Sequence, residues 1–169
     1  MIRTVLDTTA AWLAALIDGE GSVMLNRRTY SGNSPATRQP SGPIYRPVVV
    51  VASTTDYRLM DAIREKLTCG QVYQHRAGGD ARAPRKRSQW TYRLNVGQIR
   101  EALPPIRPWL VLKGEQADLL AEAMEIKQQI TPGQPGFLLV NRPALKQRLD
   151  AIYLEIRALN TRGREVMPT

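Results

Sequence analysis

A carboxylate-rich corner follows the first apolar stretch of the chain. Residues 13–22 read LAALIDGEGS, so Asp18 and Glu20 come directly after an alanine-rich segment of helical character. The C-terminal end of a helix carries partial negative charge, and a carboxylate placed there is repelled rather than held. Gly19 and Gly21 free the backbone at a turn that a side chain would obstruct. This arrangement costs stability unless a positively charged group sits against Glu20.

Other common site chemistries lack the side chains that they need. His75 is the one histidine, so a histidine-based nucleophile or zinc site has no partners in the sequence. Cys69 is the one cysteine, which excludes an internal disulfide and a cysteine-based zinc site and fits a reducing compartment. The sequence also contains no glycine-rich phosphate loop of the P-loop type.

The net charge of +9 is concentrated in the middle of the chain. Residues 27–107 contain 15 Lys and Arg against 5 Asp and Glu, whereas the remainder contains 9 basic and 10 acidic residues. Arginine supplies 19 of the 24 basic residues, and its planar donor fork suits phosphate and guanine edges. A solubilising surface is also basic in many proteins, but segregation this strong favours a nucleic-acid partner.

The composition is that of an intracellular protein. With 169 residues and 43% hydrophobic side chains, the chain can bury a sizeable core within one domain, residues 1–169. No apolar run approaches the roughly 18 residues of a membrane span. Residues 10–17 have the length of a signal-peptide core, but Asp7 precedes them and no clean cleavage site follows. We expect a cytoplasmic protein, or an organellar one in a eukaryote, that is not secreted and has no membrane partner.

Two pairs of strands alternate with helices along the sequence. Strands are expected at residues 22–30, 44–53, 71–76 and 89–96. Helices are expected from Thr8 or Thr9 to about Asp18, from a cap at Thr54, Thr55 or Asp56 to about Leu67, at 98–110, from Lys113 to Ile130, and at 142–160. Pro104, Pro105 and Pro108 are expected to break the helix at 98–110. This order predicts an α+β domain with one antiparallel sheet and helices on one face.

The segment LAALIDGEGS resembles the LAGLIDADG motif of homing endonucleases. The order helix–hairpin–helix–hairpin–helix is similar to the αββαββα core of that family, whose antiparallel sheet is saddle-shaped. The segment IRPWLVLKGEQADLL resembles the region after the second hairpin in single-motif members. The resemblance covers about residues 8–130 and leaves 131–169 as a C-terminal loop and helix. One copy of the motif implies a homodimer.

The resemblance implies a metal site at the end of the motif. Its last acid is a metal ligand in the family, so Glu20 and the carbonyl of Gly19 are expected to bind Mg²⁺, for which Mn²⁺ or Ca²⁺ could substitute in binding. If two copies of the motif helix cross at a dyad, two Glu20 carboxylates converge and repel each other. Divalent cations with oxygen ligands would relieve that repulsion. No organic cofactor is expected.

Three further residues match catalytic positions of the family. Lys113 stands where members have a basic residue near the scissile phosphate. Ser53 stands where members commonly have a Gln or Asn that orders water, and Arg58 is a candidate second basic contact. Small side chains at one side of the motif helix would let two copies approach closely, so the expected dimer interface comprises Ala11, Ala14, Ala15 and Asp18. Of these, Asp18 is expected to be a structural residue at the helix end.

DNA recognition is expected from the two hairpins, because an antiparallel ribbon fits the major groove and presents alternate side chains to base edges. The candidate base-contacting residues are Asn26, Arg28, Tyr30, Arg38, Arg46, Gln74, Arg76, Gln89 and Arg93. The candidate phosphate-contacting residues are Arg82, Arg85, Lys86 and Arg87, which would position the DNA without specifying its sequence.

The resemblance implies an intron-encoded endonuclease that makes a double-strand break in a long, near-palindromic DNA site. Phosphodiester hydrolysis would depend on the metal and leave 3′ overhangs. Two other functions remain open. The chain could be an RNA maturase that assists intron splicing, or a DNA-binding regulator without cleavage activity. The presence of Gly19, Glu20 and Lys113 favours the nuclease over both alternatives.

Overall fold

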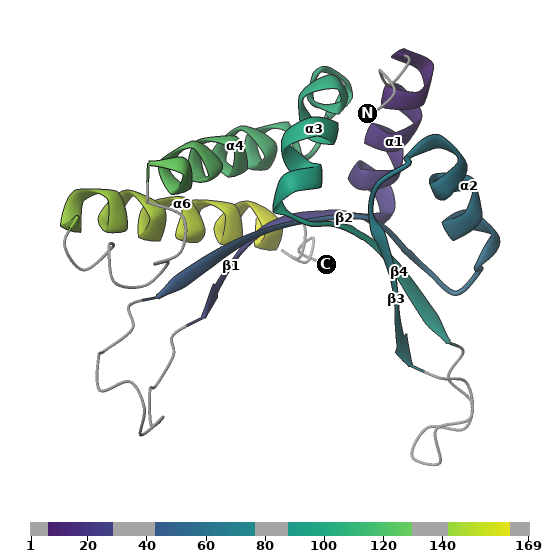
Figure 1. Ribbon diagram of the computed structural model, residues 1–169, viewed down its shortest axis with the longest axis horizontal. Coiled ribbons are helices and arrows are strands. Elements are labelled where there is room, and N and C mark those ends of the chain that lie inside the picture. Colours follow the sequence, from purple (N-terminus) through teal and green to yellow (C-terminus); the bar gives the residue numbers. More distant parts are fainter. Residues whose placement is uncertain (1–6, 29–42, 77–87, 130–141, 163–169) are drawn as a thin grey trace, which may run out of the picture. The chain divides into compact units, whose positions relative to one another are not determined.

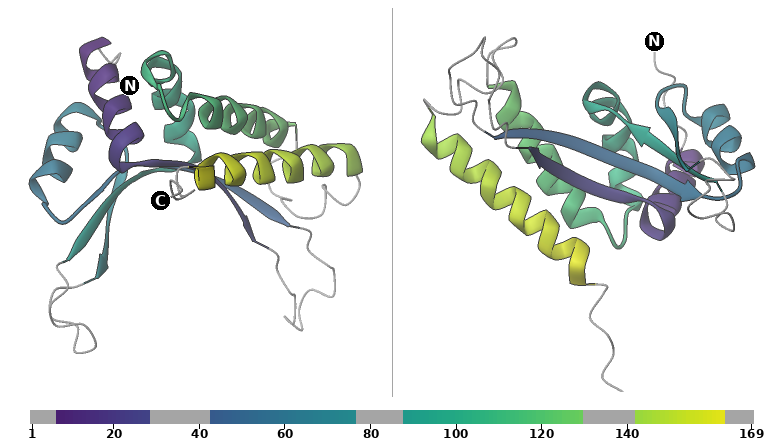
Figure 2. Two further views of the ribbon diagram at one scale, coloured as in Figure 1. Left: turned by 180° about the vertical axis from the view of Figure 1, so that it is seen from behind. Right: turned by 90° about the horizontal axis from the view of Figure 1, so that it is seen from below.

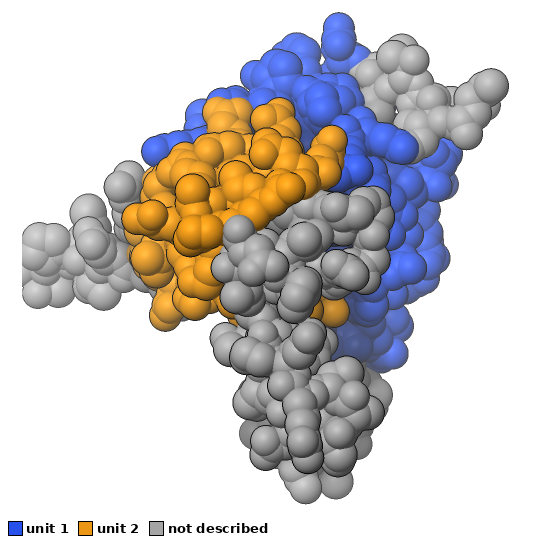
Figure 3. All heavy atoms as spheres, turned by 60° about the vertical axis from the view of Figure 1, so that its left-hand side comes forward, with its two compact units in different colours: residues 1–23, 48–117 blue, residues 24–47, 118–169 orange. Residues whose placement is uncertain are grey.

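The computed structural model describes residues 7–28, 43–76, 88–129 and 142–162 (Figure 1). Contacts divide the chain into two compact units (Figure 3). The first unit comprises residues 1–23 and 48–117, and the second comprises residues 24–47 and 118–169. A single domain over residues 1–169 therefore stays a prediction.

The elements follow the order expected from the sequence. The helices are α1 (Asp7–Glu20), α2 (Arg58–Lys66), α3 (Val96–Ile106), η1 (a 3₁₀ helix, Arg107–Trp109), α4 (Gly114–Gln128) and α6 (Pro143–Arg162). The strands are β1 (Ser22–Arg28), β2 (Ile44–Thr54), β3 (Gln71–Arg76) and β4 (Gln89–Leu94). They form one four-stranded antiparallel sheet with the order β1-β2-β4-β3. The predicted α+β fold class is confirmed.

In the first unit, helices α1 and α3 lie on the same side of the strands and contact each other (Figures 1 and 2). Leu13 and Ile17 of α1 and Ile99 of α3 are fully buried there. A capping box starts α3, since the side chain of Asn95 accepts the N–H of Gln98 at 3.2 Å and the Gln98 side chain accepts the N–H of Asn95 at 2.9 Å. This packing fixes the C-terminal end of α1 against the chain that follows α3.

The expectation that prolines break the third helix was wrong in its position. Helix α3 continues through Pro104 and Pro105 to Ile106, and Pro108 lies in η1. Each proline lacks the N–H that would bond to the carbonyl four residues earlier, so the last turn of α3 loses two helical hydrogen bonds. Leu103 and Ile106 are buried in that same turn, so packing stabilises the helix despite the missing donors.

In the second unit, α4 and α6 lie on the same side of the ends of β1 and β2 (Figure 2). Leu149 and Ile152 of α6 are fully buried, as is Leu120 of α4. Among the helices that the structure describes, none is long and apolar enough to cross a membrane. Leu149, Ile152 and Ile156 form the buried side of α6, which packs within the second unit.

Candidate functional site

The carboxylate of Asp18 joins the end of α1 to the segment before α4. Its Oδ2 accepts the backbone N–H of Val111 at 2.7 Å and of Leu112 at 3.1 Å, and its Oδ1 accepts the N–H of Lys113 at 2.9 Å. The carboxylate thereby pairs three consecutive backbone N–H groups of the segment that leads into α4. Asp18 therefore has a structural task within its own chain.

The ammonium group of Lys113 is the positive charge at the C-terminal end of α1. Its Nζ donates to the carbonyl oxygens of Ile17 at 2.6 Å and Asp18 at 2.5 Å. These carbonyls belong to the last turn, where the helix supplies no donors of its own. Burial lowers the pKa of Lys113 from its ordinary value, and the nearby carboxylates of Asp18 and Glu20 partly oppose this shift.

Helix α1 extends two residues further than expected, so that Glu20 is its last residue. Gly19 is therefore helical rather than part of a turn, and no heavy atom lies within 4 Å of the position that a Cβ would occupy. Gly21 is constrained differently, because a Cβ there would collide with the backbone carbonyl oxygens of Val50 and Val51. The exposed Glu20 carboxylate is thus presented where the chain turns closely past β2.

In the part of the chain that the structure describes, Glu20 does not belong to a group of side chains that could hold a metal ion. Within residues 7–28, 43–76, 88–129 and 142–162, no group of three or more His, Cys, Asp or Glu side chains could hold a metal ion. The Glu20 carboxylate and the Gly19 carbonyl are oxygen ligands of the kind that Mg²⁺ and Ca²⁺ prefer. They fit a metal whose remaining ligands come from a second chain, from a substrate or from water.

Ser53 lies in a small hydroxyl and amide cluster on the sheet. Its Oγ lies 3.2 Å from Oγ1 of Thr91, with which it pairs across β2 and β4. Gln89 donates from Nε2 to the same Oγ at 3.0 Å. The predicted catalytic residue Ser53 and the predicted base-contacting residue Gln89 are therefore neighbours, while Thr91 is a member of this cluster that the sequence reasoning missed.

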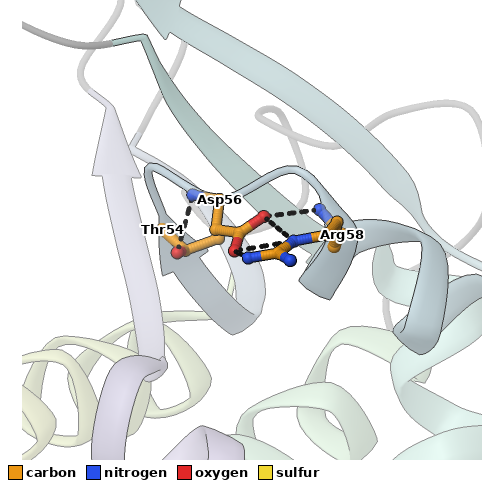
Figure 4. A network of polar contacts seen from close by, with 3 residues as sticks. All are labelled: Thr54, Asp56 and Arg58. Atoms are coloured by element: carbon orange, nitrogen blue, oxygen red, sulfur yellow. Dashed lines mark hydrogen bonds and ion pairs between the residues drawn. The ribbon is translucent and has the colours of Figure 1, made fainter.

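Arg58 is paired with Asp56 at the start of α2 (Figure 4). Its Nε lies 3.0 Å from both carboxylate oxygens of Asp56, and its Nη2 lies 2.5 Å from Oδ2. Asp56 also accepts the backbone N–H of Arg58 at 3.0 Å, and Thr54 accepts the N–H of Asp56 at 3.1 Å. Hydrogen bonds from Arg58 lower the pKa of Asp56 to about 2. Arg58 thus lies in an exposed ion pair, with a side chain 90% accessible to solvent.

The pairing of β3 with β4 shows which side chains share a face of the sheet. Thr91 pairs with Tyr73 and Arg93 pairs with Gln71, and directly paired residues point to the same face. We call this the outer face, because the alternate residue Tyr92 is buried on the opposite, inner face. Since alternate residues of a strand also share a face, Gln89 belongs to the outer face with Arg93.

One predicted base-contacting residue lies on the other side. Gln74 pairs with Trp90, so it shares the inner face of Tyr92 rather than the outer face of Arg93. Gln74 therefore does not share a face with Gln89 and Arg93, because an offset of one residue reverses the face of a strand side chain, and its contact with DNA stays a prediction. A register shift follows between Gln74 and Arg76, where Arg76 pairs with Gln89.

Besides Thr91, sequence reasoning missed Gln71, Tyr73 and His75 on this outer face. Tyr73 pairs with Thr91, and His75 lies 3.0 Å from Nη2 of Arg93. The apolar and half-buried Val72 precedes Tyr73, and this alternation is the signal that could have placed Tyr73 on the outer face. No sequence signal places His75, because it falls at the register shift between Gln74 and Arg76.

Three candidate base-contacting residues of the first hairpin share the exposed side of their strands. Leu25 of β1 and Tyr45 of β2 are buried, whereas their neighbours Asn26, Arg28 and Arg46 are exposed. Six other candidates lie outside the described residues: Tyr30, Arg38, Arg82, Arg85, Lys86 and Arg87.

The small residues of α1 do not all face outward. Ala14 is 0% exposed, because it packs into the core of its own chain, so its assignment to a dimer interface was wrong. Ala15 is exposed and Ala11 is half-buried, so these two still offer a small-residue surface on α1. Their role in a dimer stays a prediction.

Comparison with known proteins gives similarity at the level of structure alone. No protein-family model matches the chain, and no curated protein matches its sequence. Among solved structures, the homing endonuclease I-CvuI in complex with its target in the presence of Ca has a TM-score of 0.64 and 19% identity, covering 96% of this chain and 87% of that chain.

Two further solved structures agree. The archaeal intron-encoded homing endonuclease I-Vdi141I complexed with DNA has a TM-score of 0.64 and 16% identity, covering 90% of this chain and 84% of that chain. The LAGLIDADG homing endonuclease I-GzeII in complex with a DNA target has a TM-score of 0.60 and 11% identity, covering 95% of this chain and 50% of that chain. Together with the strand order and the α1 corner, these similarities show that the chain has the fold of the LAGLIDADG homing endonucleases.

Proposed function

We propose that the chain is a site-specific DNA endonuclease that hydrolyses phosphodiester bonds with a divalent metal and acts as a homodimer. The observation that carries this proposal is the corner at the end of α1. There an exposed carboxylate, Glu20, lies in the field of a half-buried ammonium, Lys113, whose position is fixed by two backbone carbonyls. Solved structures of the same fold are homing endonucleases complexed with DNA.

The proposed metal is Mg²⁺, with Mn²⁺ or Ca²⁺ able to support binding. Solved complexes of I-CvuI were obtained in the presence of Ca and of Mg, which is compatible with this choice. The Glu20 carboxylate and the Gly19 carbonyl would hold the metal. A bound divalent cation activates water and stabilises the leaving oxygen of a phosphodiester. Because one chain offers few ligands within its described residues, a second copy would complete the site.

The remaining residues of the corner would position and stabilise the phosphate. Lys113 holds a positive charge at the site without needing the metal, which favours a phosphate oxygen that gains charge during cleavage. Asp18 accepts the backbone N–H of Lys113, and this bond would keep the ammonium of Lys113 in position at the site. The hydroxyl of Ser53 would order water. Arg58 would contact a phosphate after its ion pair with Asp56 is broken.

The outer faces of the two hairpins would contact the target DNA. The excess of arginine within residues 27–107 lies on the segments that carry these hairpins. Two copies related by a dyad would read a near-palindromic site, since equal surfaces contact equal half-sites. We propose that cleavage leaves 3′ overhangs and that the gene resides in an intron, as in the intron-encoded I-Vdi141I.

Cleavage of a randomised duplex library tests this function directly. Purified full-length protein is incubated with the library in Mg²⁺ and, as the control, in Mg²⁺ with an excess of chelator, and new DNA ends are sequenced. The proposal expects one long, near-palindromic cut site that appears only with Mg²⁺ alone. Equal cutting in the chelator would contradict metal-dependent hydrolysis. An absence of enriched ends despite salt-sensitive DNA binding would favour a binding protein, with structured RNA as the next substrate to test.

A further inference from the structure

Four side chains on the outer face of β3 and β4 are connected to one another. We call Gln71, Tyr73, His75 and Arg93 the outer-face cluster. The Tyr73 hydroxyl donates to Oε1 of Gln71 at 2.5 Å, and the guanidinium carbon of Arg93 lies 5.2 Å from the centroid of the Tyr73 ring. Nη2 of Arg93 lies 3.0 Å from Nε2 of His75. These contacts hold the guanidinium of Arg93 between an aromatic ring and an imidazole.

The hydrogen-bond roles in this cluster follow from the chemistry of its members. A guanidinium only donates, so Nε2 of His75 accepts from Arg93 and the proton of the neutral imidazole lies on Nδ1. The amide of Gln71 uses its oxygen to accept from Tyr73, which leaves its NH₂ group to donate. Arg93 retains the N–H groups of Nη1 as donors. Three members of the cluster therefore offer donors to whatever binds against this face.

The position of Arg93 argues against a simple phosphate contact. It lies on β4 between two strands, where it pairs with Val50 of β2 and with Gln71 of β3. Its Nε is buried and has no hydrogen-bond partner within the described part of the chain, so the side chain is fixed at its base rather than extended over the rim of the sheet. A phosphate requires only a nearby charge, whereas a base edge requires a guanidinium of fixed orientation.

We infer that the outer-face cluster reads a guanine in the major groove of each half-site. Arg93 would contact the base, while Tyr73 and His75 would be positioning residues that fix the guanidinium. Guanine presents two acceptors there, N7 and O6, whereas adenine and cytosine each present an amino donor that would face the donors of the cluster. Fixing the arginine before binding lowers the entropy lost on binding. This inference rests on the proposed recognition of DNA.

The test is selection of bound duplexes from a randomised library, with the full-length protein in Ca²⁺ so that binding is recovered apart from cleavage. The wild type is compared with Arg93→Lys, which keeps the charge and loses the planar fork. The matched control is Arg100→Lys, an exposed arginine of α3 away from the sheet face. We expect one half-site position with a preference for guanine of about tenfold or more in the wild type and in Arg100→Lys. In Arg93→Lys, the four bases should be recovered at nearly equal frequency at that position, while the base preferences at the other positions stay unchanged.

A second pair of variants tests the positioning role. His75→Gln keeps an acceptor for Arg93 and His75→Ala removes it. We expect the guanine preference at the same position to survive in His75→Gln and to weaken several-fold in His75→Ala. Thermal unfolding followed by circular dichroism identifies any variant that fails to fold, and the His75 pair then carries the test if Arg93→Lys is lost.

Three outcomes overturn the inference. A uniform loss of affinity at all positions in Arg93→Lys would make Arg93 a phosphate contact. An unchanged base preference in Arg93→Lys would remove it from the interface. A guanine preference that falls equally in His75→Gln and His75→Ala would deny the positioning role. By contrast, a wild type that enriches no sequence would overturn the proposed DNA recognition itself, so the two failures are distinguishable.

Discussion

Lys113 places an ammonium group against the carbonyl oxygens of the last turn of α1, close to the carboxylate of Glu20. The resemblance of LVLKGEQA to a family segment placed a basic residue near Glu20. Nζ of Lys113 donates to the carbonyls of Ile17 and Asp18, which are 96 and 95 residues away in the sequence. Such contacts depend on how distant segments pack, and no local sequence pattern predicts them. The structure also answers why the motif tolerates Glu20 at a helix end, since Lys113 supplies the opposite charge there.

For Gln74, an offset of one residue decides which face of the sheet the side chain joins. The residues QVYQHR alternate too weakly to fix which side chains are buried, because only Val72 is apolar at a position that decides the face. Pairing with β4 supplies the missing information, since Trp90 and Tyr92 bring Gln74 and Val72 to the inner face. Strand position is therefore predictable here from composition, whereas strand register requires the partner strand.

Gly19 and Gly21 should respond in opposite directions to alanine. Gly21→Ala places a methyl group against the carbonyl oxygens of Val50 and Val51, so we expect a loss of about 1–3 kcal/mol in the free energy of unfolding. Gly19→Ala adds a methyl group in open space within a helix, so we expect a gain of about 0.5–1 kcal/mol. Urea unfolding of both variants measures the difference. Similar effects at the two positions would contradict the close approach of the chain at Gly21.

Glu20→Gln separates cleavage from binding. The substitution keeps the size of the side chain and removes the charge that a metal requires, so we expect cleavage of the selected site to fall by about 100-fold or more while DNA affinity changes little. The matched control is Glu115→Gln in the first turn of α4, which should cut normally. Single-turnover cleavage and filter binding on the same duplex supply the two measurements. Cutting at the wild-type rate by Glu20→Gln would remove Glu20 from the proposed site.

At the scale of elements, one carboxylate joins α6 to the first hairpin. Asp150 accepts from the hydroxyl of Tyr45 at 2.5 Å and from Nζ of Lys146 at 3.0 Å, and Nε of Arg27 lies 3.3 Å away. Tyr45 comes from β2 and is 1% exposed, whereas Arg27 comes from β1. Lys127 of α4 also donates to the Tyr45 carbonyl at 2.5 Å. The C-terminal helix therefore positions the hairpin that carries Asn26, Arg28 and Arg46.

A double-mutant cycle measures this junction. Tyr45→Phe and Asp150→Asn each remove part of one part-buried network, so we expect each to cost about 1–3 kcal/mol and the double variant to cost less than their sum. The control is Glu122→Gln, which breaks a more exposed ion pair between α4 and Arg148 and should cost about 1 kcal/mol or less. Strict additivity of the Tyr45 and Asp150 effects would show that the two side chains do not act together.

The same junction predicts how acid affects stability. Burial alone would raise the pKa of Asp150, but hydrogen bonds from Tyr45 and Lys146 and the charge of Arg27 together hold it below its ordinary value. A carboxylate whose pKa is lower in the folded state contributes stability at pH values above its unfolded pKa of 3.8 and loses it as the pH falls through the folded pKa. The midpoint temperature of thermal unfolding should therefore fall more steeply for the wild type than for Asp150→Asn as the pH is lowered from about 6 to about 2. Parallel curves would contradict this contribution.

The order of the elements was predictable because each segment has the hydrophobic spacing of a helix or a strand and is bounded by capping or turn residues. Helix α2 begins where Thr54 and Asp56 form a polar turn, and α3 begins at a capping box that Asn95 and Gln98 complete. The end of α3 was less predictable, because the burial of Leu103 and Ile106 outweighs the local effect of two prolines. Local signals thus predict the order of the elements but not each boundary, since α3 begins at Val96 rather than at 98 and the N-cap of α2 is Tyr57, while packing decides how far the helices extend.

At the scale of the whole chain, charge segregation has a measurable consequence. Basic residues exceed acidic ones by ten within residues 27–107, and the rest of the chain is close to neutral. Phosphate contacts by these residues would release condensed counterions on binding. We expect the affinity for non-specific duplex DNA to fall by about 1,000-fold or more between roughly 50 and 200 mM salt. Fluorescence anisotropy with a labelled duplex measures the slope, and a flat response would contradict a basic DNA-binding surface.

The bonds between Asp18 and residues 111–113 also constrain the order in which the protein can be made. They join positions 93 to 95 residues apart, so they cannot form until the chain has been synthesised past Lys113. Contacts of such long sequence separation are costly to close and form slowly. A chain that ends before this point contains the Glu20 motif but lacks Lys113, the cation beside it. On the proposed function, the host genome would be exposed to a cutting enzyme only after most of the polypeptide had emerged and folded.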